Sequence, residues 1–257
     1  MKLLVFVMLL FAQHGNSSPL RGTRQEFGAE TRGMKQDHDP ETLQELLSDQ
    51  QEVTEGDILL LSDRNAVGRA WPTLDLPYDI NPGIDSRTGD ISAAMTMVSE
   101  HTCVTFHKRN SSEPDFLHFT SGTGCGSYVG FVGGEQSVLI APSCSVGNIA
   151  HEILHALGFH HEHSREDRDQ YISIEYQNII KGKEDNFRKH NGKTFNISYD
   201  FTSIMHYGRK FFSSNGEATI IPNMDVKELG QRKRMQKSDI QKVRQLYHCD
   251  SLKAASS

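Results

Sequence analysis

The chain has 257 residues, of which 36% are hydrophobic and 23% are charged, and its formal net charge is −6. This length accommodates one domain of ordinary size with additional segments. Residues 16–64 hold 5 Lys or Arg against 11 Asp or Glu, so the acidic surplus belongs to this leading segment and nothing indicates nucleic-acid binding.

The first segment is typical of a secretory signal peptide. Lys2 is followed by an apolar run from Leu3 to Ala12, which is too short to span a bilayer, and small polar residues come next. We place the signal peptide at residues 1–16, with an N-terminal buried strand as the alternative. No other stretch approaches the length of a membrane span. We therefore expect a secreted, extracellular protein that is soluble and has no membrane contact.

Secretion lets the four cysteines be interpreted as two disulfides, for which the sequence alone permits three pairings. Cys125 and Cys144 flank a glycine-rich stretch, which favours a local bridge. Cys103 would then pair with Cys249 and close the remaining domain end to end.

Residues 17–64 are polar, and the leucines of residues 43–47 predict a short helical patch. Such a segment buries little apolar area, so we expect it to be loose or to lie on another domain. It ends at Arg64, whose polar surroundings suit a trypsin-like processing protease that cuts between Arg64 and Asn65.

Strand and helix patterns alternate in the next part of the chain. Residues 76–80 are typical of a strand, and apolar residues at helical spacing predict a helix over 88–98. Two more strands are predicted at 116–119 and 137–141. Closely spaced glycines between them indicate turns.

Near the C-terminus, Ser238 and the residues after it form a capping-box start for a last helix that runs to Cys249. The basic run Arg232-Lys233-Arg234 is interpreted as a solvated loop.

The most informative stretch is the H-E-x-x-H pattern at residues 151–155, followed by Gly158 and His161. On a helix, His151 and His155 project from one face and can bind one ion. Glu152 is turned by about 100° from His151, beside the ion. Glycine adopts left-handed backbone angles easily, so Gly158 can end the helix and let the chain return His161 to the metal.

Three imidazoles with one open coordination position are typical of a catalytic zinc site, since structural zinc sites are usually closed by four protein ligands. The pattern with its glycine and third histidine would arise in roughly 2 of 10,000 shuffled chains, so chance is a poor explanation. The alternatives are an exposed helix that is merely rich in histidine and a disulfide-rich structural protein.

From His151 to Arg168 the chain reads HEILHALGFHHEHSREDR, which resembles the astacin signature HExxHxxGFxHExxRxDR at every fixed position. The sequence SIMHY at 203–207 is similar to the methionine-containing turn that follows this core in metzincins. The resemblance runs from the prosegment to the last cysteine.

The resemblance implies an α+β fold of the two-subdomain metzincin (zincin) type. Its active-site cleft would lie between an N-terminal half made of a sheet and helices and an irregular C-terminal half. Residues 65–249 would be the catalytic domain, residues 17–64 the propeptide and residues 250–257 a short tail. Residues 125–130 are similar to the rim of the cleft, where a sheet edge can pair with an extended peptide.

The resemblance also implies a zinc endopeptidase that acts as a monomer on protein or peptide substrates. Its ligands for one zinc ion per chain would be His151, His155 and His161. Glu152 would be the general base toward the attacking water. Tyr207 would bind zinc at rest and stabilise the oxyanion, with a core tyrosine as the alternative. Met205 would form an apolar floor beneath the ion.

Further positions match the family's activation residues. Gly56-Asp57 resembles the propeptide aspartate that caps the zinc, although alone it would suggest a linker turn. Glu162 matches the glutamate that binds the mature N-terminus, here at Asn65. The resemblance implies the disulfides Cys103–Cys249 and Cys125–Cys144.

Within the family, the compact build resembles fish hatching enzymes, which implies egg-envelope substrates. Those enzymes carry an extra cysteine pair near the mature N-terminus, and residues 65–72 contain none. The alternatives are a secreted digestive or tissue astacin with other protein substrates and a catalytically inactive zinc-binding relative.

Overall fold

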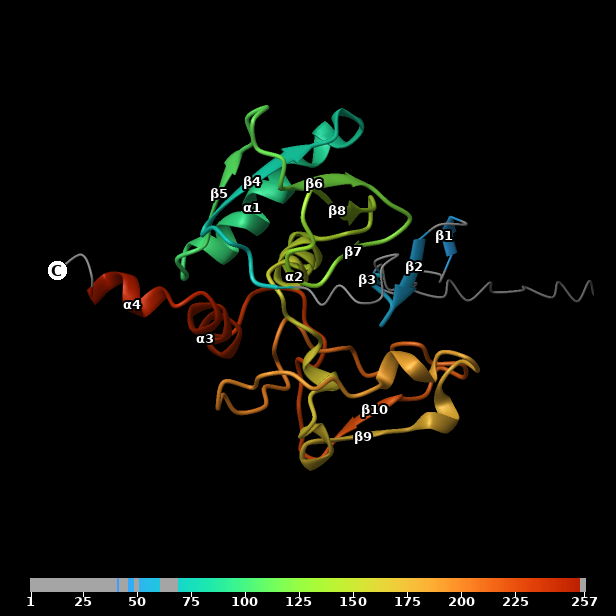
Figure 1. The fold of residues 1–257 in the computed structure, drawn as a ribbon. Helices are drawn as coiled ribbons and strands as arrows, with labels where there is room; N and C mark the ends of the chain where they lie inside the picture. The colour runs from blue at the N-terminus through green and yellow to red at the C-terminus, as the bar shows by residue number, and fades with distance from the viewer. Residues whose placement is uncertain (1–40, 42–45, 49–50, 61–68, 255–257) are drawn as a thin grey trace, which may run out of the picture. The chain divides into compact units, whose positions relative to one another are not determined.

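A mixed eight-stranded sheet organises the first part of the chain (Figure 1). The computed structural model describes residues 41, 46–48, 51–60 and 69–254. The predicted signal peptide, the processing point at Arg64 and Asn65, and residues 255–257 lie outside the described residues. All described residues belong to the unit that spans 37–257.

The sheet has the strand order β1-β2-β3-β7-β8-β6-β4-β5. Its strands are β1 Leu46–Ser48, β2 Gln51–Thr54, β3 Ile58–Leu59, β4 Asp75–Ile80, β5 Thr105–Lys108, β6 Phe116–Ser121, β7 Gly126–Ser127 and β8 Glu135–Ile140. Strands β5, β4, β6 and β8 run parallel to one another, whereas β7 is antiparallel to β8. The strands predicted at 76–80, 116–119 and 137–141 are therefore confirmed as β4, β6 and β8.

Two helices pack against this sheet and against each other, α1 Thr88–Ser99 and α2 Val146–Ala156. The predicted helix over 88–98 is confirmed as α1. It buries Ile91, Ala94, Met95 and Val98, because residues three and four apart share one face of a helix. These side chains join the main hydrophobic core.

The second part of the chain is mostly irregular and has a hydrophobic core of its own, which includes Phe187, Tyr207 and Ile220. Its regular elements are a two-stranded sheet and short 3-10 turns, namely β9 Ile172–Ile174, β10 Ile220–Pro222, η2 Glu162–Ser164, η3 Arg168–Gln170, η4 Tyr176–Asn178 and η5 Glu184–Phe187. Another 3-10 turn, η1 Pro82–Arg87, precedes α1. This division agrees with the predicted α+β fold of a sheet-and-helix half and an irregular half.

The chain closes with α3 Lys237–Leu246 and α4 Cys249–Ala254. The capping box predicted to start at Ser238 is wrong by two residues: the N-cap is Gln236, whose backbone N–H donates to the carboxylate of Asp239 at 2.8 Å, so the helix begins at Lys237. It ends at Leu246, short of the predicted Cys249, where α4 begins. The disulfides are Cys103–Cys249 and Cys125–Cys144, which confirms both predicted pairings.

The helical patch predicted from the leucines of residues 43–47 is wrong where the structure describes it. Residues 46–48 form strand β1, which pairs antiparallel with β2. The leucines have helical spacing, but pairing with strand β2 stabilises an extended conformation instead. Among the described residues, no helix is both long enough and apolar enough to cross a bilayer.

Candidate metal centre and active site

Helix α2 positions the first two predicted zinc ligands. The helix is capped by Ser145, whose hydroxyl accepts the backbone N–H of Asn148 at 3.2 Å, while the Asn148 side chain accepts the backbone N–H of Ser145 at 2.9 Å. Residues four apart lie one above the other on this helix, so the rings of His151 and His155 are neighbours, with centroids 4.6 Å apart.

Gly158 turns the chain back toward the two histidines, as the sequence predicted. Helix α2 ends at Ala156, and Gly158 has φ of +110°, a value that side-chain-bearing residues rarely adopt. After this turn, the Nε2 atom of His161 lies 3.3 Å from that of His151 and 3.2 Å from that of His155. All three side chains are buried.

The other nitrogen of each ring faces a hydrogen-bond acceptor. The pairs are His151 Nδ1 with the Ile204 carbonyl at 2.8 Å, His155 Nδ1 with the Phe159 carbonyl at 2.7 Å and His161 Nδ1 with Glu55 Oε2 at 2.6 Å. Oxygen acceptors place the hydrogen on Nδ1, which leaves the Nε2 lone pairs facing one another. Lone pairs at this separation repel unless a cation lies between them.

Asp57 supplies a fourth donor. Its Oδ2 atom lies 3.2 Å from Nε2 of both His151 and His161, and its Oδ1 atom lies 3.6 Å from Nε2 of His155. Oδ1 is buried and has no hydrogen-bond partner within the described part of the chain. Three imidazole nitrogens and one carboxylate oxygen within reach of a single ion form a donor set that zinc prefers. The residues present therefore fit a zinc ion.

The charges around His161 favour a cation at this point. Burial opposes a positive charge on the ring, but the carboxylates of Asp57 and Glu55 outweigh it and raise the pKa of His161 to about 9. Burial also opposes the negative charge of Asp57, yet His161 and His155 hold the pKa of Asp57 well below its usual value.

Glu152 lies beside this centre without a partner. Both carboxylate oxygens are buried, and neither makes a hydrogen bond to any residue that the structure describes. Burial, followed by the negative charges of Asp57 and Glu41, raises the pKa of Glu152 well above its usual value. A carboxylate that is close to a metal centre and free of competing contacts can accept a proton from water.

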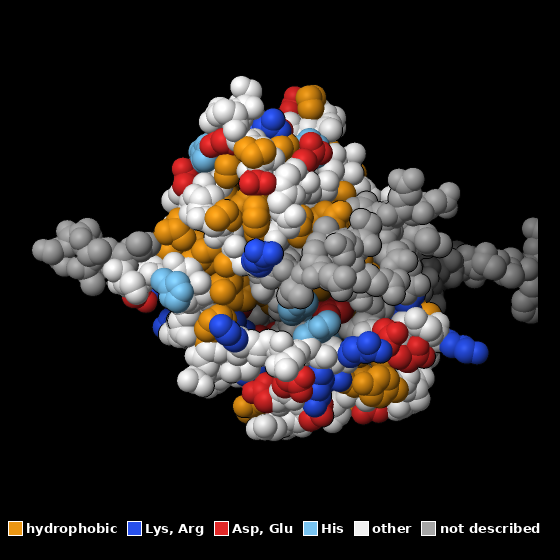
Figure 2. Space-filling model, viewed as in Figure 1, with side chains coloured by type: hydrophobic (Ala, Val, Ile, Leu, Met, Phe, Trp, Pro, Cys, Tyr) orange, Lys and Arg blue, Asp and Glu red, His pale blue; other side chains and the backbone are white. Residues whose placement is uncertain are grey.

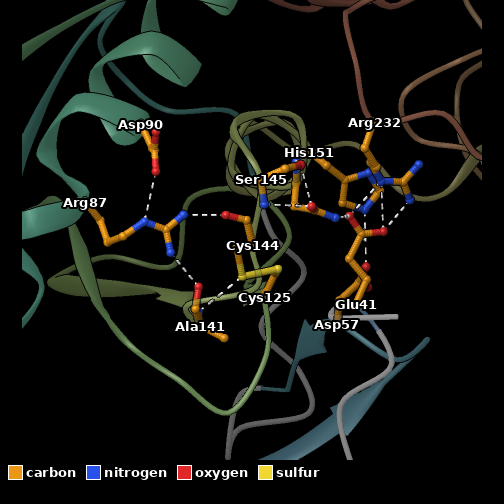
Figure 3. Close-up of a disulfide and its surroundings, with 11 residues drawn as sticks. Glu41, Asp57, Arg87, Asp90, Cys125, Ala141, Cys144, Ser145, His151 and Arg232 are labelled. Carbon is orange, nitrogen blue, oxygen red and sulfur yellow. Dashed lines mark hydrogen bonds and ion pairs between the residues drawn. A yellow bond between two sulfur atoms is a disulfide. The ribbon is translucent and has the colours of Figure 1, made fainter. Parts of the chain in front are cut away.

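Glu41 also lies near the centre, close to His151 and Glu152, and was not predicted (Figure 3). Its fully buried carboxylate accepts hydrogen bonds from Nε of Arg232 at 2.6 and 2.9 Å, from Nη2 of the same residue, and from the Asn148 side chain at 2.5 Å. The interpretation of Arg232 as part of a solvated loop is therefore wrong, because burial of Glu41 draws this arginine inward. Lys233 and Arg234 are exposed or half-exposed and pair with Glu228.

Glu55 is a second unpredicted contact from the same segment. One oxygen of its buried carboxylate accepts the hydrogen of His161 Nδ1, and the other forms an ion pair with His190. Burial opposes ionisation, but the hydrogen bonds from the two histidines keep the pKa of Glu55 below its usual value. No sequence pattern indicates this residue, since its partners lie more than 100 positions away.

The segment that carries Asp57 also binds the edge of the main sheet. Strand β3 pairs in parallel with β7, and the backbone N–H of Ser127 donates to the carbonyl of Asp57 at 2.9 Å. Gly56 has φ of +76°, and a Cβ there would lie 2.6 Å from the Glu41 carbonyl and 2.8 Å from the Phe212 ring. The predicted sheet edge at 125–130 thus pairs with an extended segment of the chain itself.

The hydroxyl of Tyr207 donates a hydrogen bond to the backbone carbonyl of Glu55. Its fully buried ring stacks on His163, with centroids 3.8 Å apart, and lies 4.5 Å from the ring of His161. In this intact chain the hydroxyl is therefore engaged by the leading segment, beside the metal centre.

The methionine-containing turn lies behind the histidines. Met205 is buried in the main core, and its carbonyl accepts the backbone N–H of Glu162 at 2.9 Å. Asp239 on α3 holds the same turn, since its carboxylate accepts the Ser203 hydroxyl at 2.5 Å and the backbone N–H of Ile204 at 3.1 Å. The turn thereby orients His151 through the Ile204 carbonyl.

Glu162 has partners within the second part of the chain. Its buried carboxylate accepts hydrogen bonds from Arg165 at 3.0 Å, from the backbone N–H of Asp200 at 3.1 Å and from Lys242. The predicted partner, the ammonium at Asn65, lies outside the described residues.

Comparison with known proteins identifies the family. The family described as "Astacin (Peptidase family M12A)" matches residues 63–248. The zinc metalloproteinase nas-4 of Caenorhabditis elegans is 37% identical over 246 residues, which are 88% of this chain and 76% of that protein. High choriolytic enzyme 1 of Oryzias latipes is 38% identical over 214 residues, 77% of this chain and 78% of that protein.

A solved structure agrees with these matches. The structure of high choriolytic enzyme 1, described as a hatching enzyme zinc-protease from medaka, superposes with a TM-score of 0.66 at 36% identity. The match covers 75% of this chain and all of that one. Some relatives are much longer, since the matched region is 33% of Blastula protease 10 from Paracentrotus lividus. With its family match, its fold and its cluster of three histidines, this chain belongs to the astacin family of zinc metalloproteinases.

Proposed function

We propose that this chain is the secreted zymogen of a zinc endopeptidase, kept latent by Asp57. The observation that carries the proposal is the buried Asp57 carboxylate, which lies within 3.2 to 3.6 Å of the Nε2 atoms of all three histidines. A carboxylate at this point takes the coordination position that a catalytic zinc site keeps open for water and substrate.

In the active form, the zinc ligands would be His151, His155 and His161. Zinc bound there polarises the substrate carbonyl and makes water more acidic. Glu152 accepts the proton of the attacking water and passes it to the leaving nitrogen, a role that suits its unpartnered carboxylate. The Tyr207 hydroxyl, once free of Glu55, donates to the oxyanion that develops on the substrate.

Three contacts support latency in the intact chain. Asp57 faces the three histidines, strand β3 occupies the edge of β7 where a substrate strand could pair, and the Glu55 carbonyl engages the Tyr207 hydroxyl. Removal of one segment would therefore free the metal, the sheet edge and the oxyanion donor together.

We propose that a trypsin-like protease carries out this removal by cutting between Arg64 and Asn65. Residues 1–16 would be the signal peptide and residues 17–64 the propeptide. The catalytic domain would span 65–249, with a short tail at 250–257, and the protein would act in the extracellular space as a monomer.

The substrates would be extracellular proteins. Similarity to high choriolytic enzyme 1, a hatching enzyme zinc-protease, supports egg-envelope proteins as the first candidates. The absence of cysteines from residues 65–72 favours the second candidate, a digestive or tissue protease with other protein substrates. Peptide-library profiling together with the tissue of expression decides between them.

The latency proposal is tested on intact protein in which Arg64→Gln prevents processing. Asp57→Ala in this background should hydrolyse casein measurably, whereas the intact parent should not. Asp63→Ala, the same change six positions later, serves as the matched control and should stay inactive. If Asp57→Ala is as inactive as the parent while zinc remains bound, Asp57 does not hold the enzyme latent.

A further inference from the structure

A buried lysine neutralises the carboxylate next to the third histidine. The ammonium of Lys242 donates to Oε2 of Glu162, and the exposed fractions of the two side chains are 11% and 2%. Oε1 of Glu162 accepts from Arg165 and from the backbone N–H of Asp200. The carboxylate is thus satisfied on both oxygens by partners within residues 162–242, and none of the described residues of the leading segment contributes.

Lys242 also lies among other acidic groups. Burial raises the pKa of Asp239 above its usual value, and the positive charge of Lys242 opposes that shift. Lys242 contributes less to the lowered pKa of Asp167, which its hydrogen bond with Arg165 dominates, and to that of Asp200, where burial is outweighed by hydrogen bonds from Ser238 and Thr202. Lys242 and Asp239 lie one turn apart on α3, so one helix presents a cation to Glu162 and a carboxylate to the methionine-containing turn.

The carboxylates of Glu162 and Asp239 are each connected to a predicted metal ligand, through the chain or through hydrogen bonds. Glu162 follows His161, and its backbone N–H donates to the Met205 carbonyl at 2.9 Å. Asp239 holds the backbone N–H of Ile204, whose carbonyl accepts the hydrogen of His151 Nδ1 at 2.8 Å. Lys242 is therefore paired with the residue that follows His161, and Asp239, one turn away on the same helix, is two hydrogen bonds removed from His151.

We infer that Lys242 is a positioning residue of the active site. Its ammonium holds the carboxylate of Glu162 in place, and Glu162 in turn fixes the turn that carries His161. Since Glu162 already has the guanidinium of Arg165 and the ammonium of Lys242, it does not need the new ammonium at Asn65 as a counter-charge. Activation then requires only that the leading segment leaves. This inference rests on the proposed zymogen.

The experiment compares two N-terminal forms of the processed protein. One is cut after Arg64 and starts at Asn65; in the other, two glycines inserted between Arg64 and Asn65 displace the new ammonium, and protein sequencing verifies both ends. In the wild type we expect kcat/KM and zinc retention against a chelator to differ less than about twofold between the forms. Lys242→Met should lose about 10- to 100-fold in zinc affinity in both forms, as is typical for residues that support a metal ligand.

Lys242→Arg, which keeps the charge, is the matched control and should recover most of the zinc affinity. The inference is overturned if the glycine insertion weakens zinc retention as much as Lys242→Met does, or if Lys242→Met cut at Asn65 retains zinc like the wild type. Circular dichroism of each variant shows whether the fold is intact. Arg244→Met, on the same helix, shows how much the loss of a surface cation alone changes zinc retention. If the wild type binds zinc but cleaves no protein, the proposed function fails, while zinc retention still tests Lys242.

Discussion

The fully buried carboxylate of Glu41 is paired with the guanidinium of Arg232, 191 residues further along the chain. A buried ion pair is costly to break from one side, because the remaining charge stays buried without its partner. The pair therefore holds the leading segment to the rest of the chain at Glu41, in addition to the contacts of Asp57.

We expect Glu41→Gln and Arg232→Gln each to lower the unfolding free energy of the intact protein, in the Arg64→Gln background, by about 3 kcal/mol. The double variant should lose less than the sum, with a coupling energy of about 2 kcal/mol, since either change alone breaks the same pair. Denaturant unfolding measures all three. Lys233→Gln, which removes an exposed charge next to Arg232, should change stability by less than about 0.5 kcal/mol. Strictly additive losses would show that the two residues do not act as a pair.

Glu152→Gln should leave zinc bound and abolish proteolysis in the processed protein. The amide keeps the shape of the side chain but cannot accept a proton from water, and we expect kcat to fall at least about 100-fold. Zinc content per chain and casein hydrolysis are measured together. His161→Ala is the contrasting variant, because loss of a ligand should release the metal itself. Full activity of Glu152→Gln would rule out its role as the base.

Tyr207→Phe should lower kcat much more than it changes KM, because the proposed hydroxyl contact strengthens only in the transition state. The expected loss in kcat is about 100-fold, the size typical for removal of one oxyanion donor. Steady-state kinetics on a peptide substrate measure it. Tyr199→Phe, which removes another buried hydroxyl, one bonded to His206 at 2.7 Å, controls for a general loss of packing. A change confined to KM would assign Tyr207 to substrate binding.

The two disulfides should differ in their effect on stability. Cys103–Cys249 joins residues 146 apart and Cys125–Cys144 joins residues 19 apart. A longer closed loop removes more entropy from the unfolded chain, so replacing the first pair by serine should cost about 5 kcal/mol and the second about 3 kcal/mol. Denaturant unfolding of the two double variants measures this. The reverse order would contradict the entropy argument for this chain.

The parts of the site that local sequence determines were predictable. His151 and His155 are one helical turn apart, and Gly158 needs backbone angles that only glycine adopts easily, so the spacing alone predicts a three-histidine cluster. Strands β4, β6 and β8 and helix α1 were likewise predictable, because the strands are short stretches that contain apolar residues and α1 repeats its apolar residues at helical spacing.

Contacts between distant residues that neither the cysteines nor a family motif indicated were not predictable. The hydrogen bonds of Glu41 with Arg232, of Glu55 with His161 and of Lys242 with Glu162 span 191, 106 and 80 positions. A basic run such as 232–234 is usually solvated, and only the folded chain reveals that one of its members faces a buried carboxylate. The resemblance indicated Asp57, but neither local pattern nor motif indicated the two glutamates that accompany it.

The bridge between Cys103 and Cys249 also bears on how such a protease withstands its own activity. The bridge makes a covalent ring of the chain between these two residues, and helix α2, the methionine-containing turn and Lys242 all lie inside it. A neighbouring molecule that cuts one exposed loop of this ring opens it but releases no fragment. Each half of the cleft stays tethered to the other, so a single nick should leave one molecule that can still hold its metal.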